Sequence, residues 1–326
     1  MKRAQIVGVG AYAPERVLTN RDLEAMVETS DEWIAKRTGI RERRIACPNE
    51  AASDLALRAA RQALERAGVA PGQVDFIVVG TTTGDMAVPT TANLLQHQLG
   101  CRNVGSLDLH AACSASIYSL SVGAQYIETG KYATVLCVGT EVLSRVTDYM
   151  DRGTCILLGD GAGAAVLRAC ESGVGILDVD LYSDGRYADL LQIPASGSRR
   201  AASHESVDEG AHYIKMKGSE VFKVAVRMFG ECAERILARH GFAASDLDLF
   251  VPHQANLRVI EAAVARIGFP MDKVVVNLDR YGNTGAASVY VALEEAWTTG
   301  RLRSGDLVLL AAFGGGFTWG AALIRW

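Results

Sequence analysis

Residues 104–118 read Val104-Gly-Ser-Leu-Asp-Leu-His-Ala-Ala-Cys113-Ser-Ala-Ser-Ile-Tyr118 and change from one backbone pattern to another. The apolar approach over residues 104–109 is typical of a strand, and the apolar positions that follow have helical spacing and end at Gly130. We therefore predict that Cys113 lies at a strand-to-helix turn. The unpaired N–H groups and the positive dipole end of a helix favour a thiolate there, and the thiolate is the nucleophilic form of cysteine.

A buried structural cysteine is the alternative interpretation, and it holds for most cysteines of a chain with this composition. The remaining cysteines have no such turn around them and are interpreted as structural: Cys47, Cys101, Cys137, Cys155, Cys170 and Cys232. The chain has no CxxC pair and no His/Cys cluster at metal-ligand spacing. The sequence therefore predicts neither a disulfide framework nor a metal site, and it indicates a reducing compartment.

Short apolar segments alternate with helical patterns on both sides of this turn, as in α/β proteins with buried sheets. Strands of the first half are expected near residues 5–9, 74–79, 104–109, 134–138 and 162–167. Strands of the second half are expected near residues 174–181, 247–251, 274–278 and 307–311. Helices are expected over residues 53–67, with Ser53 as the N-cap and Gly68 as the stop, and over residues 219–239.

The two halves of the chain repeat one order of elements. The segment from Val74 to Cys113 and the segment from Leu247 to Asn283 begin with similar strands and have similar lengths. We predict a duplicated architecture in which Cys113 and Asn283 lie at equivalent turns across a pseudo-two-fold axis. The first half is residues 1–170, and the second half is residues 171–326.

The composition excludes several classes of protein. The chain has 326 residues, of which 49% are hydrophobic and 21% charged, so it can bury a substantial core and is not disordered. Its formal net charge of -4 argues against general nucleic-acid binding. The sequence shows no apolar run as long as a membrane span and no apolar signal segment before the first expected strand. We expect a cytoplasmic protein that binds neither membranes nor nucleic acids.

Three loops of the second half gather polar and glycine residues. In Val251-Pro-His253-Gln-Ala-Asn256, the histidine follows a buried strand, where ligands of open α/β sheets often bind, although a lone histidine is more often structural. Tyr281-Gly-Asn283 by itself is an ordinary turn. Phe313-Gly-Gly315-Gly-Phe317 would either let N–H groups approach a ligand or form a flexible turn. No single loop decides the function.

Taken together, these motifs resemble one family, the β-ketoacyl-acyl carrier protein synthases of type III, which are condensing enzymes with the thiolase fold. The resemblance extends over nearly the whole chain. It is carried by Thr29-Ser-Asp-Glu-Trp33-Ile-Ala-Lys-Arg37-Thr-Gly-Ile-Arg-Glu-Arg43, Asp151-Arg152-Gly-Thr154, Gly159-Asp-Gly-Ala-Gly-Ala-Ala-Val166, Val251-Pro-His-Gln-Ala-Asn-Leu-Arg258, Gly282-Asn-Thr284 and Phe313-Gly-Gly-Gly-Phe-Thr-Trp-Gly320. The fold that it implies has two βαβαβαββ halves in an αβαβα arrangement of layers.

The resemblance implies catalytic roles for three side chains. Cys113 matches the nucleophile that takes the acyl group from acyl-CoA, and the backbone N–H groups of Cys113 and Gly315 match the oxyanion hole. His253 and Asn283 match the pair that donates hydrogen bonds to the enolate formed when malonyl-acyl carrier protein loses carbon dioxide. Asparagine at the third position is typical of the priming type, because elongating synthases have a second histidine there and thiolases a second cysteine.

Further residues match the family's binding positions. Trp33 and Arg152 would hold the adenine of coenzyme A between them, and Arg37 would contact its phosphate-bearing part. Walls of the substrate tunnel would include Met216, Phe222 and Asn256. Docking of the acidic carrier protein would use Lys223, Arg258 and Arg266. The alternative interpretation is core packing for the aromatic and apolar residues and solvated surface for the charged ones.

Two departures from the family pattern concern the acyl pocket. Ser116 replaces a phenylalanine that many members have shortly after the nucleophile. Val88 replaces a phenylalanine that, in the acetyl-priming type, closes the pocket from across the dimer interface. With Leu191, these smaller residues are expected to line a pocket for longer or branched starters, because the end of the pocket decides which chains fit.

We therefore expect an acyltransferase that condenses an acyl-CoA starter with malonyl-acyl carrier protein through an acyl-Cys113 intermediate. The product would be 3-oxoacyl-acyl carrier protein, at the start of fatty acid biosynthesis. We expect a homodimer that uses coenzyme A thioesters as substrates and needs no cofactor or metal. The alternative is a specialised relative of secondary metabolism with another acyl acceptor. A non-catalytic scaffold is disfavoured by the complete set of Cys113, His253 and Asn283.

Overall fold

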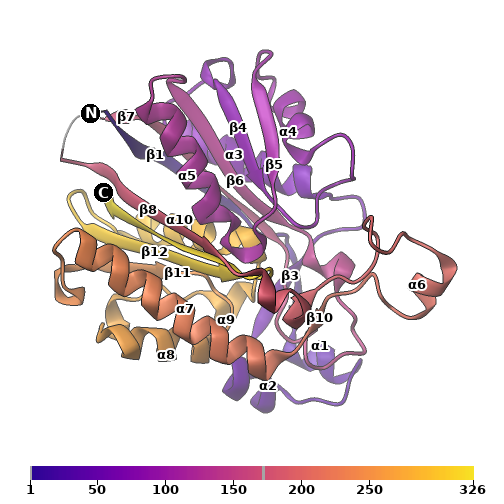
Figure 1. The fold of residues 1–326 in the computed structure, drawn as a ribbon. Helices are drawn as coiled ribbons and strands as arrows, with labels where there is room; N and C mark the ends of the chain where they lie inside the picture. The colour runs from indigo at the N-terminus through magenta and orange to yellow at the C-terminus, as the bar shows by residue number, and fades with distance from the viewer. Residues whose placement is uncertain (1, 171–172) are drawn as a thin grey trace.

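The computed structural model describes residues 2–170 and 173–326, which form two main sheets and their covering helices (Figure 1). The strands of the first sheet are β1 (Arg3–Tyr12), β4 (Phe76–Gly80), β5 (Gly105–Leu109), β6 (Thr134–Glu141) and β7 (Gly161–Cys170). The strands of the second sheet are β8 (Gly175–Ser183), β11 (Leu249–Pro252), β12 (Leu307–Gly314) and β13 (Thr318–Arg325).

The two sheets repeat one pattern of strand directions. The order of the first sheet is β1-β7-β6-β4-β5, and the order of the second is β11-β12-β13-β8. In the first sheet β4 pairs parallel with β6, while β6 with β7 and β7 with β1 pair antiparallel. In the second sheet β11 pairs parallel with β12, while β12 with β13 and β13 with β8 pair antiparallel. Strand β5 extends the first sheet by one further parallel strand.

Helices form the other three layers. Helices α5 (Ala115–Glu128) and α10 (Ser288–Thr298) lie between the two sheets, as Figure 1 shows. The outer face of the first sheet is covered by α3 (Ala52–Arg66) and α4 (Thr91–Leu99). The outer face of the second sheet is covered by α7 (Gly218–Arg239) and α8 (Leu257–Ile267). The predicted αβαβα arrangement is therefore confirmed.

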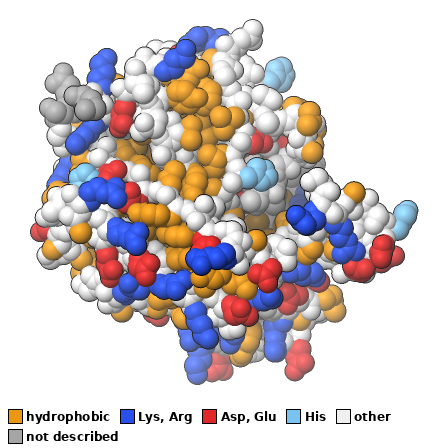
Figure 2. Space-filling view, viewed as in Figure 1, with side chains coloured by type: hydrophobic (Ala, Val, Ile, Leu, Met, Phe, Trp, Pro, Cys, Tyr) orange, Lys and Arg blue, Asp and Glu red, His pale blue; other side chains and the backbone are white. Residues whose placement is uncertain are grey.

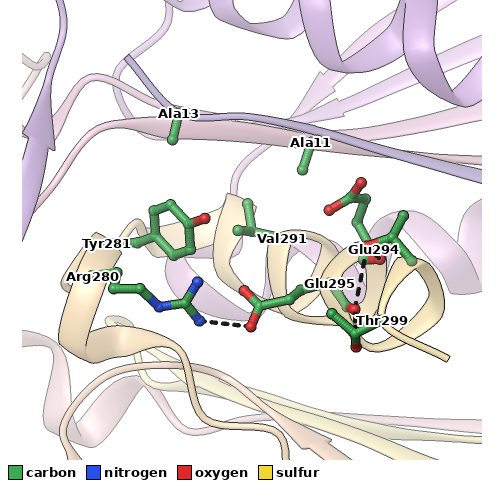
Figure 3. A pocket seen from close by; sticks show the side chains of 9 residues that line it. Ala11, Ala13, Arg280, Tyr281, Val291, Glu294, Glu295 and Thr299 are labelled. Atoms are coloured by element: carbon green, nitrogen blue, oxygen red, sulfur yellow. Dashed lines mark hydrogen bonds and ion pairs between the residues drawn. The ribbon is translucent and has the colours of Figure 1, made fainter. Parts of the chain in front are cut away.

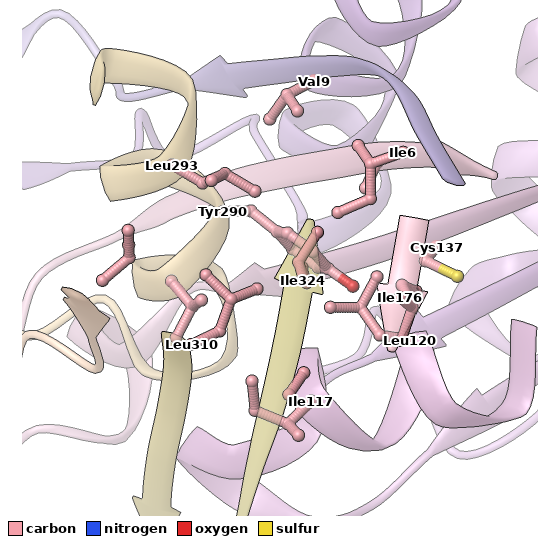
Figure 4. Packing of buried hydrophobic residues seen from close by; sticks show 14 of the residues in the cluster. Ile6, Val9, Ile117, Leu120, Cys137, Ile176, Tyr290, Leu293, Leu310 and Ile324 are labelled. Carbon is pink, nitrogen blue, oxygen red and sulfur yellow. The ribbon is translucent and has the colours of Figure 1, made fainter. Parts of the chain in front are cut away.

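The middle layer joins the cores of the two sheets (Figure 4). Side chains of α5 and α10 pack here against β1 of the first sheet and against β12 and β13 of the second: Ile117, Leu120, Tyr290, Leu293, Ile6, Val9, Leu310 and Ile324. Burial of each large apolar side chain contributes about 1.5–3 kcal/mol. Because both sheets pack against the same two helices, the first residues of α5 and α10 are held in fixed positions relative to each other.

The structure corrects the predicted strand over residues 274–278. That segment forms only a single parallel bridge, between Val274 and Phe250, before α9 (Leu278–Tyr281) begins. The backbone N–H of Asn277 donates to the side chain of Gln254 and not to a neighbouring strand. This segment comes after β11 and a helix, just as β5 comes after β4 and a helix. It is therefore the counterpart of β5 in the second half, but it is too short to form a strand.

Further differences concern ends and short elements. The N-cap of α3 is Ala51, because the N–H and hydroxyl of Ser53 both donate to Asp85 inside the first turn. The sequence analysis did not predict β13. It also did not predict the short pairs of β2 (Arg16–Thr19) with β3 (Glu42–Ile45) and β9 (Leu191–Gln192) with β10 (Lys215–Met216), nor the short helices α1 (Asn20–Glu24), α2 (Asp31–Thr38) and α6 (His204–Asp208).

The division of the chain into residues 1–170 and 171–326 stays a prediction, since residues 171–172 lie outside the described part. Across the described ranges, we find no helix with both the length and the apolar character that a membrane crossing requires.

Candidate active site

Cys113 lies in a tight turn between β5 and α5. A 3-10 turn, Ala112–Ser114, follows β5, and Ala112 has a φ of 44°, in the left-handed region that alanine rarely adopts. The turn is held by three hydrogen bonds to the carbonyl oxygen of Ala111, from the N–H of Ser114 at 3.1 Å, from its hydroxyl at 2.7 Å and from the Thr318 hydroxyl at 2.8 Å. The surrounding structure thus fixes a strained conformation that presents Cys113.

The glycine loop after β12 lies directly against this turn. A Cβ on Gly314 would stand 2.6 Å from the backbone nitrogen of Cys113, so only glycine fits there. The next residue, Gly315, lies beside Leu191, whose carbonyl oxygen would be 3.2 Å from a Cβ on Gly315. Among the described residues, no backbone carbonyl accepts from the N–H of Cys113 or of Gly315. Both N–H groups are therefore available to a ligand.

His253 follows β11 and is almost fully buried, with 3% of its surface exposed. Its backbone N–H donates to the carbonyl oxygen of Ala311 at 2.8 Å, and its Nδ1 lies 2.5 Å from the hydroxyl oxygen of Ser288. Removal from water disfavours the charged imidazolium and lowers the pKa of His253 to about 3. The imidazole is therefore neutral at physiological pH and carries a single N–H.

Asn283 is held by both its backbone and its side chain. Its N–H donates to the carbonyl of Leu157 at 2.8 Å, and its carbonyl accepts from the N–H of Gly159 at 3.0 Å. Its side-chain oxygen accepts from the N–H of Gly285 at 2.9 Å. This last bond orients the amide and leaves the Nδ2 group as the donor that a ligand meets.

Packing brings the three predicted catalytic residues to one place. Ala111 and Ala115, on either side of Cys113, form one buried cluster with Ala286, which follows Asn283. His253 joins through Ser288, the first residue of α10. The two turns therefore meet at the first residues of α5 and α10, where unpaired N–H groups and helix dipoles favour negative charge.

The sequence analysis missed Glu141, at the end of β6. This buried carboxylate accepts hydrogen bonds from Thr82 and Thr83, and burial raises its pKa to about 7. Burial also raises the pKa of the Cys113 thiol to about 12, and the Glu141 carboxylate acts in the same direction. The positive end of α5 opposes both effects. Cys113 is partly exposed and these influences oppose one another, so a thiolate in the substrate-free protein stays a prediction.

The signal for Glu141 was present in the sequence. A single charged residue ends an otherwise apolar and uncharged strand over residues 134–141. Ser288, the partner of His253, carried no such signal, because a serine at the start of a helix is ordinary.

Trp33 and Arg152 meet from distant parts of the chain. Trp33 lies on α2, and the guanidinium carbon of Arg152 is 4.9 Å from the centre of its ring. The guanidinium carbon of Arg37 is 5.2 Å from the same ring. Arg152 also donates to the carbonyl of Glu28 at 3.0 Å. Two cations thus lie on one indole. Because the Arg152 guanidinium lies directly on the ring, the two side chains must separate before a flat ligand can lie between them, as the resemblance implied.

The predicted tunnel residues lie on three elements near these groups. Asn256 is the N-cap of α8, where its oxygen accepts from the N–H of Arg258 and its amide donates to the carbonyl of Arg37 at 3.3 Å. It therefore ties α8 to α2. Met216 lies on β10 and Phe222 on α7, and both are partly exposed.

The predicted docking residues lie on α7 and α8, where Figure 2 shows basic side chains interspersed with acidic ones. Lys223 and Arg258 are exposed, and the guanidinium carbon of Arg258 lies 5.8 Å from the centre of the Phe222 ring. Arg266 differs, because it pairs with Glu234 at 3.3 Å and with Glu231 at 3.7 Å. Its charge is therefore largely engaged within the protein.

The predicted acyl-pocket residues have different surroundings. Val88 is 83% exposed, in a loop that precedes α4. Ser116 is fully buried, and its hydroxyl has no hydrogen-bond partner among the described residues. Leu191 is partly buried beside Gly315. Only Leu191 is shown in contact with the glycine loop of the site.

Two cavities lie apart from Cys113, His253 and Asn283, none of which lines them. One of about 310 Å³ lies between the end of β1 and α10, and Figure 3 shows Arg280, Tyr281 and Glu295 among its lining residues. Arg280 and Glu295 pair there at 2.6 Å. Another of about 370 Å³ is lined by residues that include Lys223 and Lys217. Over the described ranges, we find no group of three or more His, Cys, Asp or Glu side chains placed to hold a metal ion.

The chain matches known proteins over its full length. Residues 107–185 match the family model of 3-oxoacyl-[acyl-carrier-protein (ACP)] synthase III, and residues 237–326 match that of its C-terminal part. The chain is 53% identical over 321 residues to a β-ketoacyl-[acyl-carrier-protein] synthase III of Symbiobacterium thermophilum, which covers 98% of this chain and 97% of that protein. It is 50% identical over 323 residues to that of Caldanaerobacter subterraneus, with 99% and 98% covered.

A solved structure gives the same result for the fold. The crystal structure of 3-oxoacyl-[acyl-carrier-protein] synthase III from Aquifex aeolicus matches with a TM-score of 0.92 and 44% identity, covering 99% of this chain and 100% of that one. The predicted thiolase fold is thereby confirmed. From the sequence matches and this shared fold, we conclude that the chain belongs to the 3-oxoacyl-[acyl-carrier-protein] synthase III family and is a condensing acyltransferase.

Proposed function

We propose that this chain condenses an acyl-CoA starter with malonyl-acyl carrier protein, and so starts fatty acid biosynthesis in the cytoplasm. The products are 3-oxoacyl-acyl carrier protein, carbon dioxide and free coenzyme A. The observation that carries the proposal is the meeting of the Cys113 turn, the Asn283 turn and His253 at the first residues of two buried helices. Family membership at about half identity over the whole chain supports it.

In the first half-reaction, the sulfur of Cys113 attacks the thioester carbonyl of acyl-CoA. The N–H groups of Cys113 and Gly315 then hold the oxygen that becomes negative, and loss of one such donor typically costs on the order of a hundredfold in rate. The carbon–sulfur bond to coenzyme A breaks, and the thiol proton of Cys113 passes overall to the departing coenzyme A thiolate. The acyl group remains on Cys113 as a thioester.

In the second half-reaction, malonyl-acyl carrier protein loses its carboxylate as carbon dioxide. The electron pair of the broken bond forms an enolate, whose oxygen accepts hydrogen bonds from the imidazole of His253 and the amide of Asn283. The enolate carbon attacks the acyl carbonyl, and the bond to Cys113 breaks. The released Cys113 thiolate takes up one proton from solvent, which restores the thiol for the next cycle. Both donors are neutral, so they stabilise the enolate without transferring a proton to it.

The binding surface fits the two carriers. The aromatic and cationic cluster of Trp33, Arg37 and Arg152 suits the adenine and phosphates of coenzyme A. The exposed cations Lys223 and Arg258 suit an acidic carrier protein, whereas the paired Arg266 contributes less. Met216, Phe222 and Asn256 would line the path between these surfaces and Cys113. The reaction as proposed uses no cofactor and no metal.

We propose a homodimer that uses the free edge of the first sheet. Strand β5 is the last strand of that sheet, and Leu107, Leu109, Val122 and Tyr126 near it are only partly buried. An unpaired sheet edge offers backbone groups for pairing with another chain, and exposed apolar surface beside it marks an interaction site. Dimerisation would also cover Val88 and bring it toward the partner's acyl pocket, where with Ser116 and Leu191 it would admit longer or branched starters.

Product identity tests the proposal. The purified protein is given malonyl-acyl carrier protein with acetyl-, isobutyryl-, hexanoyl- or decanoyl-CoA, and the carrier-bound products and Cys113 adducts are analysed by mass spectrometry. The expected result is a 3-oxoacyl-carrier product, with the larger starters accepted at least as well as acetyl-CoA. An acylated Cys113 without a condensed product would instead indicate another acceptor, and no adduct with any starter would exclude acyl transfer.

A further inference from the structure

Ser288 makes a close contact with the imidazole of His253 that the proposed reaction does not by itself assign. The Ser288 hydroxyl oxygen lies 2.5 Å from Nδ1 of His253. Ser288 is 1% exposed and is the first residue of α10, so its side chain is fixed by the packing of the middle layer. A hydrogen bond between two buried groups excludes competition from water, and its direction therefore matters.

The surroundings of Ser288 determine that direction. The backbone N–H of Gln254 donates to the hydroxyl oxygen of Ser288 at 3.4 Å. Gln254 is itself locked, because its amide donates to the carbonyls of Pro252 at 2.8 Å and Val275 at 3.0 Å, and its oxygen accepts from Asn277. The Ser288 oxygen accepts from this N–H, and among the described residues its own hydrogen has no acceptor other than Nδ1 of His253, so the hydroxyl donates to that nitrogen.

The direction of this bond sets the tautomer of the ring. A neutral imidazole has one N–H, and a nitrogen that accepts a hydrogen bond cannot also carry that proton. If Nδ1 accepts from Ser288, the proton is on Nε2. Within the part of the chain that the structure describes, Nε2 has no hydrogen-bond partner. It is also not among the polar atoms that are completely buried without a partner, so some of its surface is accessible. Nε2 is therefore the atom that a ligand meets.

We propose that Ser288 is a positioning residue, whose hydroxyl fixes the Nε2–H tautomer of His253 and so makes the imidazole a donor to the enolate. The role of His253 as a donor to the enolate rests on the proposed function, whereas the assignment of its tautomer does not. The opposite tautomer would place a lone pair, and not an N–H, against the negative oxygen. In a serine protease triad, an orienting group that holds the wrong tautomer lowers kcat by about four orders of magnitude, which shows how much such a choice can matter.

The test separates the two half-reactions in the full-length protein. Ser288→Ala removes the hydroxyl, so we expect decarboxylation of malonyl-acyl carrier protein and condensation to fall on the order of a hundredfold. Acylation of Cys113 by acyl-CoA, followed by mass spectrometry, should stay within about twofold, because it does not use the His253 donor. Ser288→Thr keeps a hydroxyl at this position and should recover most of the lost condensation.

A matched control removes a different buried hydroxyl. Ser119, on α5, is fully buried and lies 2.8 Å from the hydroxyl of Tyr290, away from His253. Ser119→Ala therefore loses the same group without touching the imidazole, and it should affect acylation and condensation alike. If Ser288→Ala also lowers acylation and condensation equally, its role is only structural and the proposal is overturned.

A spectroscopic readout does not depend on catalysis. Protein labelled with ¹⁵N in its six histidines reports the tautomer of each ring by NMR, and the His253→Ala variant identifies the relevant signal. The proposal expects a proton on Nε2 in the wild type and a mixture of tautomers in Ser288→Ala. A wild-type proton on Nδ1 would overturn it. If the wild type neither acylates nor condenses, the proposed function fails, and this measurement still decides the tautomer.

Discussion

Glu141 lies between the loop after β4 and the turn that carries Asn283. Its carboxylate accepts from the hydroxyls of Thr82 and Thr83 in the first half, and the backbone N–H of Ala286 in the second half lowers its pKa. These bonds favour the charged form, but removal from water outweighs them and raises the pKa to about 7. A carboxyl group that titrates at neutral pH thus lies close enough to the nucleophile to affect its charge.

This raised pKa predicts a pH-dependent stability. The carboxyl binds its proton more tightly in the folded chain, so its contribution is fully present below the ordinary value of 4.5 and is lost as the pH rises through about 7. The loss amounts to about 3 kcal/mol. We expect Glu141→Gln, which cannot ionise, to make the free energy of unfolding less dependent on pH between 4.5 and 7, as measured by urea denaturation.

The control for this prediction is Glu205→Gln, because Glu205 is an exposed residue of α6 far from the two turns. It should keep the wild-type dependence of stability on pH. If Glu141→Gln and Glu205→Gln show the same dependence, the buried carboxyl is not its source.

Arg152 provides a prediction about substrate affinity. Its guanidinium lies on Trp33, and a comparable contact with the adenine of coenzyme A would be worth about 0.5–2 kcal/mol. We expect Arg152→Ala to raise KM for acyl-CoA roughly tenfold with little change in kcat, since the lost contact is far from the reacting thioester. Steady-state kinetics measure this, with an acyl-pantetheine substrate as the control. That substrate lacks adenine, so an equal effect on it would contradict the assigned role.

From the sequence, candidate residues could be picked out where a residue type stands in a recognisable local turn, and their catalytic roles stay a prediction. Cys113, His253 and Asn283 each stand at the end of a recognisable apolar segment, and the structure brings their turns together. Ser288 and Glu141 could not be assigned, because their importance depends on which side chain lies opposite them. The thiol of Cys113 illustrates the same limit, since burial opposes the helix dipole and only the fold shows how deep the thiol lies.

At the scale of elements, the contact between the glycine loop and the Cys113 turn is decisive. Gly314 ends β12, and a Cβ there would be 2.6 Å from the backbone nitrogen of Cys113 and 3.0 Å from that of Ser114. Both of these atoms belong to the backbone, so they cannot move away from an added Cβ as the end of a flexible side chain could. The end of β12 and the start of α5 therefore fit only while residue 314 has no side chain.

We expect Gly314→Ala to reduce acylation of Cys113 on the order of a hundredfold or more, because it displaces the N–H of Gly315 from the oxyanion position. It should also lower stability by about 1–3 kcal/mol through overpacking. The acyl-adduct assay and thermal unfolding measure the two effects. Gly72→Ala is the control, since a Cβ at Gly72 meets no atom within 4 Å. A Gly314→Ala variant that acylates normally would show that the loop can shift without cost.

Helices and strands could be predicted where a long segment of regularly spaced apolar residues is bounded by turn residues. Helix α7 and strands β1, β6, β7 and β12 lie close to their predicted positions. The expected strand over residues 274–278 has the same apolar pattern, but the edge of the second sheet offers it only Phe250 as a bridge partner. The sequence pattern could not predict this outcome, because a segment forms a strand only where the tertiary structure gives it a neighbouring strand to pair with.

At the scale of the whole molecule, charge predicts how the two substrates respond to salt. The chain has a net charge of -4, yet the exposed Lys223 and Arg258 lie on one surface of α7 and α8. Added salt screens interactions between exposed charges. We expect turnover of malonyl-acyl carrier protein to fall more steeply with salt than acylation by acyl-CoA does, in half-reaction assays over a salt series.

Two variants locate this effect. Arg258→Ala should raise KM for malonyl-acyl carrier protein several-fold and flatten its salt dependence, because it removes an exposed charge that forms no ion pair among the described residues. Arg266→Ala should do less, because Arg266 is already paired with Glu231 and Glu234. Equal effects of the two variants, or equal salt dependence of the two substrates, would place the carrier protein elsewhere.

The repeated pattern of strand directions in the two sheets has a consequence for the reaction itself. A condensation of this kind joins two thioesters, one attacked at its carbonyl carbon and the other attacking through the carbon next to its carbonyl. In the proposed reaction, one carbonyl binds at Cys113 in the first half and the other at Asn283 in the second half, and the turns of both residues pack together. The symmetry of the fold thus mirrors the near-symmetry of its substrates. Under the proposed function, the presence of cysteine at one turn and asparagine at the other would decide which thioester becomes the electrophile.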